Sequence, residues 1–142
     1  TKARENSPIE TTGELAEIIK NSVPAAYRRE KNPCRKSFQA IRIEVNDELG
    51  ALEDAVSKGF ERLKIGGRMA VITFHALEDR IVKQTFRRFE KPCTCDPKAP
   101  ICTCGKAPTA AILTKKPLTA GEAELKYNPR ARSAKLRAIE RL

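Results

Sequence analysis

The stretch 66–79 constrains the fold of this chain more than any other part of the sequence. A pair of glycines is followed there by a short, largely apolar run over 69–74. Such a run, entered from a tight turn, predicts a strand that is buried on both faces of a parallel sheet. His75, Glu78 and Asp79 follow the run directly, and ligands of open α/β sheets bind just beyond the carboxyl ends of the strands. These three side chains are therefore candidate catalytic residues.

The same three residues also have a structural interpretation. His75 is the only histidine of the chain, and a lone histidine is more often structural than catalytic. Glu78 and Asp79 fall in the first turn of a predicted helix, where the helix dipole favours acidic side chains without any function. The sequence alone leaves both interpretations open.

Helices are expected ahead of this strand. Thr11 and Glu14 have the spacing of a capping box and predict a short helix that ends near Ser22. The segment 27–36 is expected to be a charged loop. Apolar side chains then recur every three or four residues over 37–63, which predicts one long helix with a single core-facing side.

Alternating element types are expected after the strand. The segment 77–89 has the pattern of a second amphipathic helix, and 92–109 is a loop rich in proline and cysteine. A short strand is expected at 112–113, a short helix opened by a second capping box over 119–127, and a final strand over 133–142. Helix, buried strand, helix and further strands form an α/β pattern. A parallel sheet needs several strands, and only one is clear in this sequence. The chain is therefore expected to be the second half of an α/β sheet.

The net positive charge of the chain lies entirely in its second part. Residues 1–63 hold 11 Lys/Arg and 11 Asp/Glu, whereas 64–142 hold 17 Lys/Arg and 7 Asp/Glu, which accounts for the whole net charge of +10. Such asymmetry predicts binding to a polyanion, and arginine is the preferred fork for phosphate. The alternative is a solvated basic edge. The candidate RNA-binding residues are Asn128, Arg130, Arg132 and Arg137.

Four of the five cysteines form two C-x-C pairs separated by six residues, namely Cys93, Cys95, Cys102 and Cys104. Four thiolates this close in sequence can form a tetrahedral zinc site. Disulfides are the less favoured alternative, since nothing else in the sequence suggests secretion. Thiols without a metal, or with a redox role, also stay open. Cys34 stands alone and is expected to be a small apolar residue.

Several classes of protein lack support in this sequence. No apolar run approaches the roughly 20 residues that a membrane span needs, and no secretory signal is found. The polar start without an initiator Met is expected for a processed chain or a fragment. Glycine-rich dinucleotide loops, P-loops and recognisable Ser-His-Asp or Cys-His arrangements are absent from the sequence.

The motifs as a whole closely resemble the C-terminal portion of the bacterial 16S ribosomal RNA cytosine-N4 methyltransferase H family, also called MraW. The resemblance covers residues 8–142 and is carried by the segments 37–49, 66–83, 115–117 and 128–137. It implies the C-terminal half of a class I S-adenosylmethionine-dependent methyltransferase, with a Rossmann-like sheet. Residues 1–36 would then be part of a helical insertion domain, and 37–142 the C-terminal part of the methyltransferase domain. The strand after the glycine pair would be the fifth of the sheet, and the last two strands its antiparallel edge.

The resemblance also implies an activity. The expected enzyme methylates N4 of a cytosine in the decoding region of 16S rRNA with S-adenosylmethionine, in the cytoplasm. The cofactor loop would lie upstream, so no cofactor-binding residue is assigned and the isolated chain is expected to be inactive. The expected partners are 16S rRNA in the small ribosomal subunit, the N-terminal half of the enzyme and a second copy of the chain; a membrane is not expected.

The resemblance assigns roles to the candidate residues. His75, Glu78 and Asp79 would orient the base or accept a hydrogen bond from its amine, and the arginines of the basic segment would hold phosphates. Two alternatives stay open, namely a non-catalytic RNA-binding zinc module and a structural fragment without independent function.

Overall fold

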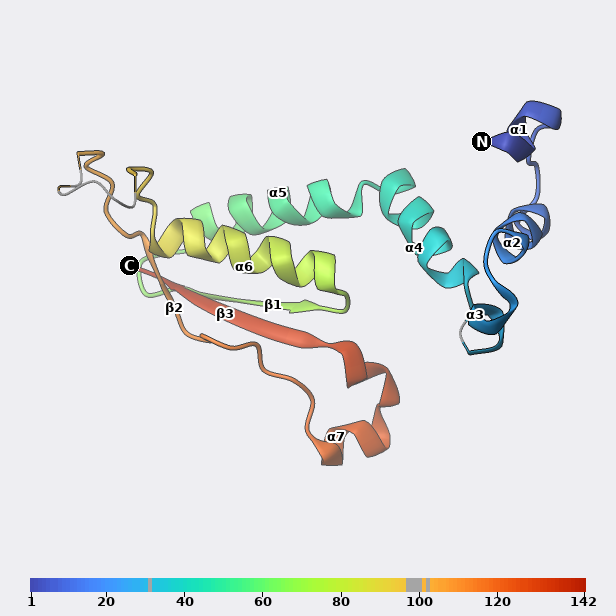
Figure 1. Cartoon of the computed structure of the whole chain (residues 1–142). Helices are drawn as coiled ribbons and strands as arrows, with labels where there is room; N and C mark the ends of the chain where they lie inside the picture. The colour runs from blue at the N-terminus through green and yellow to red at the C-terminus, as the bar shows by residue number, and fades with distance from the viewer. Residues whose placement is uncertain (31, 97–100, 102) are drawn as a thin grey trace. The chain divides into compact units, whose positions relative to one another are not determined.

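The computed structural model describes residues 1–30, 32–96, 101 and 103–142. The chain divides into two compact units, Thr1–Glu48 and Leu49–Leu142. The first unit is helical, and the second combines helices with a small sheet (Figure 1).

The described part of the first unit forms the helices α1 (Lys2–Asn6), α2 (Thr12–Asn21), α3 (Ala25–Glu30) and α4 (Cys34–Val45). The predicted capping box opens α2. The hydroxyl of Thr11 accepts a hydrogen bond from the Glu14 N–H at 3.2 Å, and the Glu14 carboxylate accepts one from the Thr11 N–H at 3.3 Å. The first predicted helix is thereby confirmed.

The predicted charged loop over 27–36 is wrong. Helix α3 covers its first part, and α4 already begins at Cys34. The residues of α3 are mostly good helix formers. Pro33 stands at the N-cap of α4, where its missing N–H leaves no helical hydrogen bond unmade.

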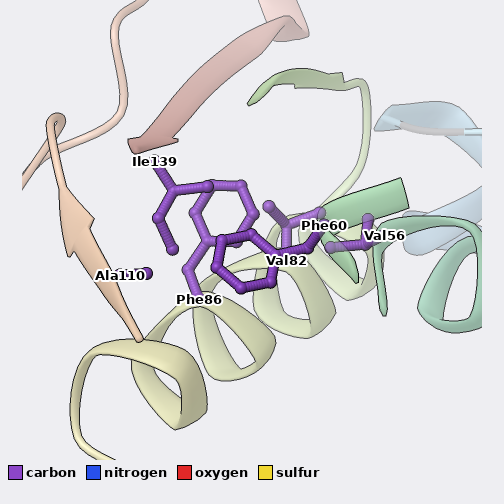
Figure 2. Packing of buried hydrophobic residues seen from close by; sticks show 6 residues of the cluster. All are labelled: Val56, Phe60, Val82, Phe86, Ala110 and Ile139. Carbon is purple, nitrogen blue, oxygen red and sulfur yellow. The ribbon is translucent and has the colours of Figure 1, made fainter. Parts of the chain in front are cut away.

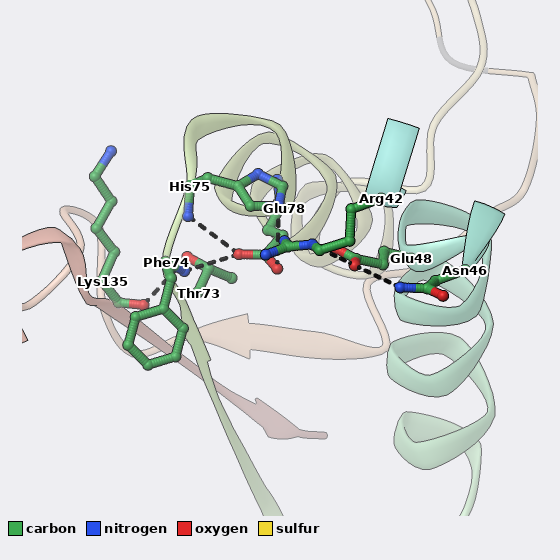
Figure 3. A network of polar contacts seen from close by, with 8 residues as sticks. All are labelled: Arg42, Asn46, Glu48, Thr73, Phe74, His75, Glu78 and Lys135. Carbon is green, nitrogen blue, oxygen red and sulfur yellow. Dashed lines mark hydrogen bonds and ion pairs between the residues drawn. The ribbon is translucent and has the colours of Figure 1, made fainter. Parts of the chain in front are cut away.

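The single long helix predicted over 37–63 is two helices, α4 and α5 (Glu48–Glu61). Between them Asp47 has a φ of 46°, the left-handed region that aspartate tolerates better than most residues. Arg42 donates to both carboxylate oxygens of Glu48 at 2.7 and 2.8 Å, and the Asn46 amide donates to the same carboxylate at 3.2 Å (Figure 3). These bonds stabilise the break between α4 and α5, which the regular apolar spacing over 37–63 does not reveal.

The second unit contains a three-stranded sheet in the order β1-β3-β2. Its strands are β1 (Arg68–Thr73), β2 (Ala110–Ile112) and β3 (Lys135–Arg141), and both pairings are antiparallel. The expected strands are therefore present, with β3 in the centre and β1 at an edge, although β2 lies at 110–112 where the prediction had 112–113.

The prediction that β1 is buried on both faces of a parallel sheet is wrong for this chain. Its residues alternate in exposure, with Thr73 at 2% and Ile72 at 56%. Its neighbour is β3, which runs in the opposite direction. The core side chains of α5 and of α6 (Ala76–Glu90) pack with those of β2 and β3, and Figure 1 shows these two helices along one side of the sheet.

The core of the second unit lies between these helices and the sheet (Figure 2). Its members are almost fully buried, namely Val56, Phe60, Val82, Phe86, Ala110 and Ile139. Phe60 stacks on Phe89 with ring centroids 4.2 Å apart. Burial of each large apolar side chain contributes about 1.5–3 kcal/mol. The apolar stripe predicted over 77–89 is thus the core-facing side of α6.

The last elements are α7 (Glu122–Tyr127) and the 3-10 helix η1 (Pro129–Ser133). The second predicted capping box is wrong, because α7 has Gly121 as its N-cap without a side-chain cap. Thr119 therefore lies outside the helix. The fold is a mixture of helices and a small antiparallel sheet, consistent with a fragment of an α/β protein, and no described helix has the length and apolarity to cross a membrane.

Candidate functional site

His75 links the end of β1 to the start of α6. It is the N-cap of α6, and its Nδ1 accepts a hydrogen bond from the Glu78 N–H at 3.3 Å. Glu78 Oε2 in turn accepts from the backbone N–H groups of Phe74 and His75, at 2.8 and 3.1 Å (Figure 3). This is a capping box in which histidine replaces the usual serine or threonine. A neutral His75 that accepts at Nδ1 carries its hydrogen at Nε2.

The second ring nitrogen of His75 has different surroundings. Nε2 is buried and has no hydrogen-bond partner in the described part of the chain. It lies 3.2 Å from Glu78 Oε1, without the alignment of a hydrogen bond. A potential donor, Nε2–H, and a potential acceptor, Oε1, therefore stand side by side at the end of β1.

Asp79 is held by basic side chains of β3. Its Oδ1 accepts from Arg137 Nε at 2.7 Å, its Oδ2 accepts from Arg137 Nη2 at 3.2 Å, and Lys135 Nζ lies 3.4 Å from Oδ2. The hydrogen bonds from Arg137 are the main cause that lowers the pKa of Asp79; the charges of Arg137 and Lys135 add to this, and burial opposes it. The contacts thus join α6 to β3, which supports the structural interpretation of Asp79.

The second unit has a basic pocket of about 380 Å³ beside α6. Four cationic side chains and one acidic side chain contribute to its lining, namely Lys83, Arg87, Lys115, Arg137 and Glu90. Sequence reasoning named only Arg137 among them. A sequence signal exists for two of the others, because the spacing of four between Lys83 and Arg87 places both on one side of α6. A pocket with this charge suits an anionic group.

The four predicted RNA-binding residues occupy two different elements. Asn128 caps η1, and Arg130 and Arg132 are exposed on it. Arg137 lies on β3, is 7% exposed and binds Asp79. The N–H groups of Arg137 that face Asp79 are engaged there, so only the rest of its guanidinium can serve the basic pocket.

Three of the four predicted metal ligands come together. The sulfur atoms of Cys93, Cys95 and Cys104 lie within 4.8 Å of one another. Cys102 lies outside the described residues. Cys34 is buried in the first unit, with its Sγ 3.5 Å from the Ala16 carbonyl oxygen, as expected for a packing residue.

Comparisons with known proteins give one consistent result. A family model described as "MraW methylase family" matches residues 1–142. A protein of Symbiobacterium thermophilum is 61% identical over 142 residues, which cover 99% of this chain and 45% of that protein. Proteins of Clostridium botulinum and Ruminiclostridium cellulolyticum are 53% and 51% identical, over 98% and 100% of this chain and 45% and 46% of their own lengths. All three are named "Ribosomal RNA small subunit methyltransferase H", and the chain spans about half their length.

Proposed function

Because the chain belongs to the MraW methylase family, we propose that it is part of an rRNA methyltransferase of the small ribosomal subunit. The supporting observation is the match over the whole chain, together with the names of relatives up to 61% identical. The finer proposal is S-adenosylmethionine-dependent methylation of cytosine N4 in the decoding region of 16S rRNA. Since the chain covers 45% of that relative, the activity is proposed for the whole protein.

The reaction sets two requirements for the protein. The lone pair of the cytosine amine is delocalised into the ring, so the enzyme must hold N4 in line with the methyl donor and accept a hydrogen bond from it. The base must also be unstacked from its RNA context. The chain has no glycine-rich loop that would hold the cofactor, so we assign only base and RNA contacts to its residues.

We place the base contacts at the end of β1. His75 Nε2–H, which is buried in this chain, would donate to a ring acceptor of cytosine once RNA binding exposes it, and Glu78 Oε1 would accept a hydrogen from N4. These atoms are adjacent, while Glu78 Oε2 is already bound by two backbone N–H groups. Asp79 would act as a positioning residue, because its carboxylate is held by Arg137 and Lys135.

We place the RNA backbone in the basic pocket and along η1. The pocket offers Lys83, Arg87 and Lys115, and η1 offers Arg130 and Arg132. Arginine and lysine in these positions would bind phosphates and fix the register of the RNA. The partner would be 16S rRNA within the small subunit in the cytoplasm, and a homodimer stays a prediction.

The remaining part of the protein would cover the exposed side of β1. The free edge of β1 pairs with no other described strand, and Ile72 and Phe74 are 56% and 57% exposed. Exposed apolar groups on an edge strand are typical of a surface that another segment covers. We propose that the N-terminal half of the enzyme pairs there, with residues 1–36 in its helical insertion and 37–142 in the methyltransferase domain.

A chimera tests the proposed activity. The chain replaces the corresponding 45% of the Symbiobacterium thermophilum protein, and the product is incubated with S-adenosylmethionine and unmethylated small subunits. We expect N4-methylcytidine in the decoding region when the rRNA nucleosides are analysed by mass spectrometry. Methylation of another atom would contradict the N4 assignment. A folded chimera that binds the cofactor and RNA without methylating would favour the non-catalytic RNA-binding module.

Two substitutions separate chemistry from helix capping in this chimera. Asparagine is a good N-cap, so His75→Asn keeps the cap and removes Nε2. Glutamine also completes a capping box, so Glu78→Gln keeps that contact while an N–H donor replaces Oε1. We expect each to lower kcat at least about 100-fold, as for the loss of an acid–base or orienting group, with the melting temperature unchanged. A variant that melts as wild type and methylates at the wild-type rate would remove its residue from the reaction.

A further inference from the structure

Figure 1 shows the connection between α6 and β2. Its described residues include a cluster of three thiols. The sulfurs of Cys93 and Cys104 are 3.7 Å apart, far beyond the about 2.05 Å of a disulfide bond. Sulfurs at the corners of a tetrahedron around zinc, with Zn–S distances of about 2.3 Å, lie about 3.8 Å from one another. The observed separation matches that of two ligands of one zinc ion, and the Cys104 thiol donates to Cys93 Sγ across it. Cys95 completes a group of three sulfurs within 4.8 Å.

Apolar packing does not explain why these thiols meet. None of the described residues between Lys91 and Thr109 is buried, and Ile101 is 74% exposed. Backbone bonding closes the base of the connection, where the Thr109 N–H donates to the Phe89 carbonyl at 3.0 Å. Ordering such a long segment costs conformational entropy that no core offsets here. A structural metal is a common substitute for a missing core.

The charge around the cluster suits thiolates. Lys106 Nζ donates to Thr94 Oγ1 at 3.3 Å, which holds the ammonium group on the same connection. The hollow beside Cys93 is lined by three cationic and two acidic side chains, namely Arg88, Lys91, Lys106, Glu53 and Asp54. The cationic side chains, which outnumber the acidic ones, would offset part of the negative charge of a zinc–thiolate centre.

We propose that Cys93, Cys95 and Cys104 bind a zinc ion that fixes the connection between α6 and β2. Soft thiolate ligands select zinc over magnesium or calcium. Each Zn–S bond forms as a thiol releases its proton to water, and no electron is transferred. The sequence predicts Cys102 as the fourth ligand; the proposal rests on the three described thiols.

Metal analysis of the 142-residue chain tests this site. The chain is purified with a reductant and without a chelator, and zinc is measured by elemental mass spectrometry. We expect about one zinc per chain, as one closed thiolate site requires. Cys93→Ser, Cys95→Ser and Cys104→Ser should each lower the zinc content to background, while the matched control Cys34→Ser keeps it. Wild-type protein that contains no zinc and takes up neither added Zn²⁺ nor Co²⁺ would overturn the proposal, as would three serine variants that keep the metal.

A measurement on the wild-type chain covers the case in which a variant does not fold. The reduced chain is alkylated with and without added Zn²⁺, and the modified cysteines are identified by peptide mass spectrometry. We expect zinc to slow the alkylation of all three cysteines at least about tenfold, as metal-bound thiolates are shielded. Equal rates with and without zinc would reject the site. Neither experiment involves RNA or methylation, so this site can fail while the proposed function stands.

Discussion

At the scale of single residues, the two ring nitrogens of His75 have separate tasks. Nδ1 accepts the hydrogen bond that caps α6, and this fixes both the ring orientation and the tautomer. Nε2 is left facing Glu78 Oε1. The His75 side chain can therefore have a structural role through Nδ1 and a catalytic role through Nε2. For this reason an alanine substitution would remove both roles at once, whereas His75→Asn removes one.

Asp79 makes the stability of the chain depend on pH. Its pKa is lower in the folded state, mainly through the hydrogen bonds from Arg137, so its contribution is complete above the ordinary carboxyl pKa of about 4. That contribution is lost as the pH falls through the lowered pKa. We expect Asp79→Asn to cost about 3 kcal/mol of unfolding free energy at neutral pH, as for a broken buried ion pair, and less in acid. Urea unfolding at a series of pH values measures both quantities.

The matched control for this prediction is Asp54→Asn. Asp54 pairs with Lys58 on the surface, with side chains 68% and 74% exposed, and such pairs contribute at most about 1 kcal/mol. A cost for Asp79→Asn that equals that of the control, or that does not change with pH, would contradict the role given to the Arg137 pair.

At the scale of elements, α6 carries both the capped end near the proposed base site and the lysine and arginine of the basic pocket. We expect the double variant Lys83→Gln/Arg87→Gln to weaken binding to a decoding-region RNA hairpin. The slope of log K against log salt should fall by about 1–2 units, because two phosphate contacts are lost. Fluorescence anisotropy at several salt concentrations measures this slope.

The control for the pocket has the same change in net charge. Lys2→Gln/Lys20→Gln removes two exposed lysines of the first unit. Both lie in residues 1–63, which carry no net charge. We expect its salt slope to match that of the wild type. Equal effects of the two double variants would mean that total charge matters and the pocket does not.

The elements also show what the sequence could and could not predict. The strand β1 follows from the apolar run after the glycine pair, and the helix α6 follows from helical periodicity; both elements are confirmed, although β1 is not buried in a parallel sheet. The break at Asp47 was missed because the apolar spacing continues across it. The pairing of Asp79 with Arg137 joins residues 58 positions apart, a distance over which local patterns give no information. Lys115 was missed for the same reason, because only the packing of α6 beside β2 and β3 brings it into one pocket with Lys83 and Arg87.

At the scale of the whole molecule, the chain holds candidate base and RNA contacts without a cofactor loop. We therefore expect the 142-residue chain alone to show no S-adenosylmethionine binding at micromolar concentrations in isothermal titration calorimetry. The chimera with the Symbiobacterium thermophilum protein is the positive control. Micromolar binding by the chain alone would show that its own residues form a cofactor site.

The central position of β3 has a consequence for how the second unit folds. Strand β1 finds its partner 62–72 residues further along the chain, and β2 pairs with the same strand. Neither can pair with β3 until residues 135–141 have left the ribosome, so α5 and α6 are synthesised before the β3 part of the surface that they cover exists. Contacts this distant in sequence slow folding, because loop closure must precede them. During synthesis, the apolar sides of these two helices are thus exposed to whatever else is present, which makes this interval the period of greatest risk for aggregation.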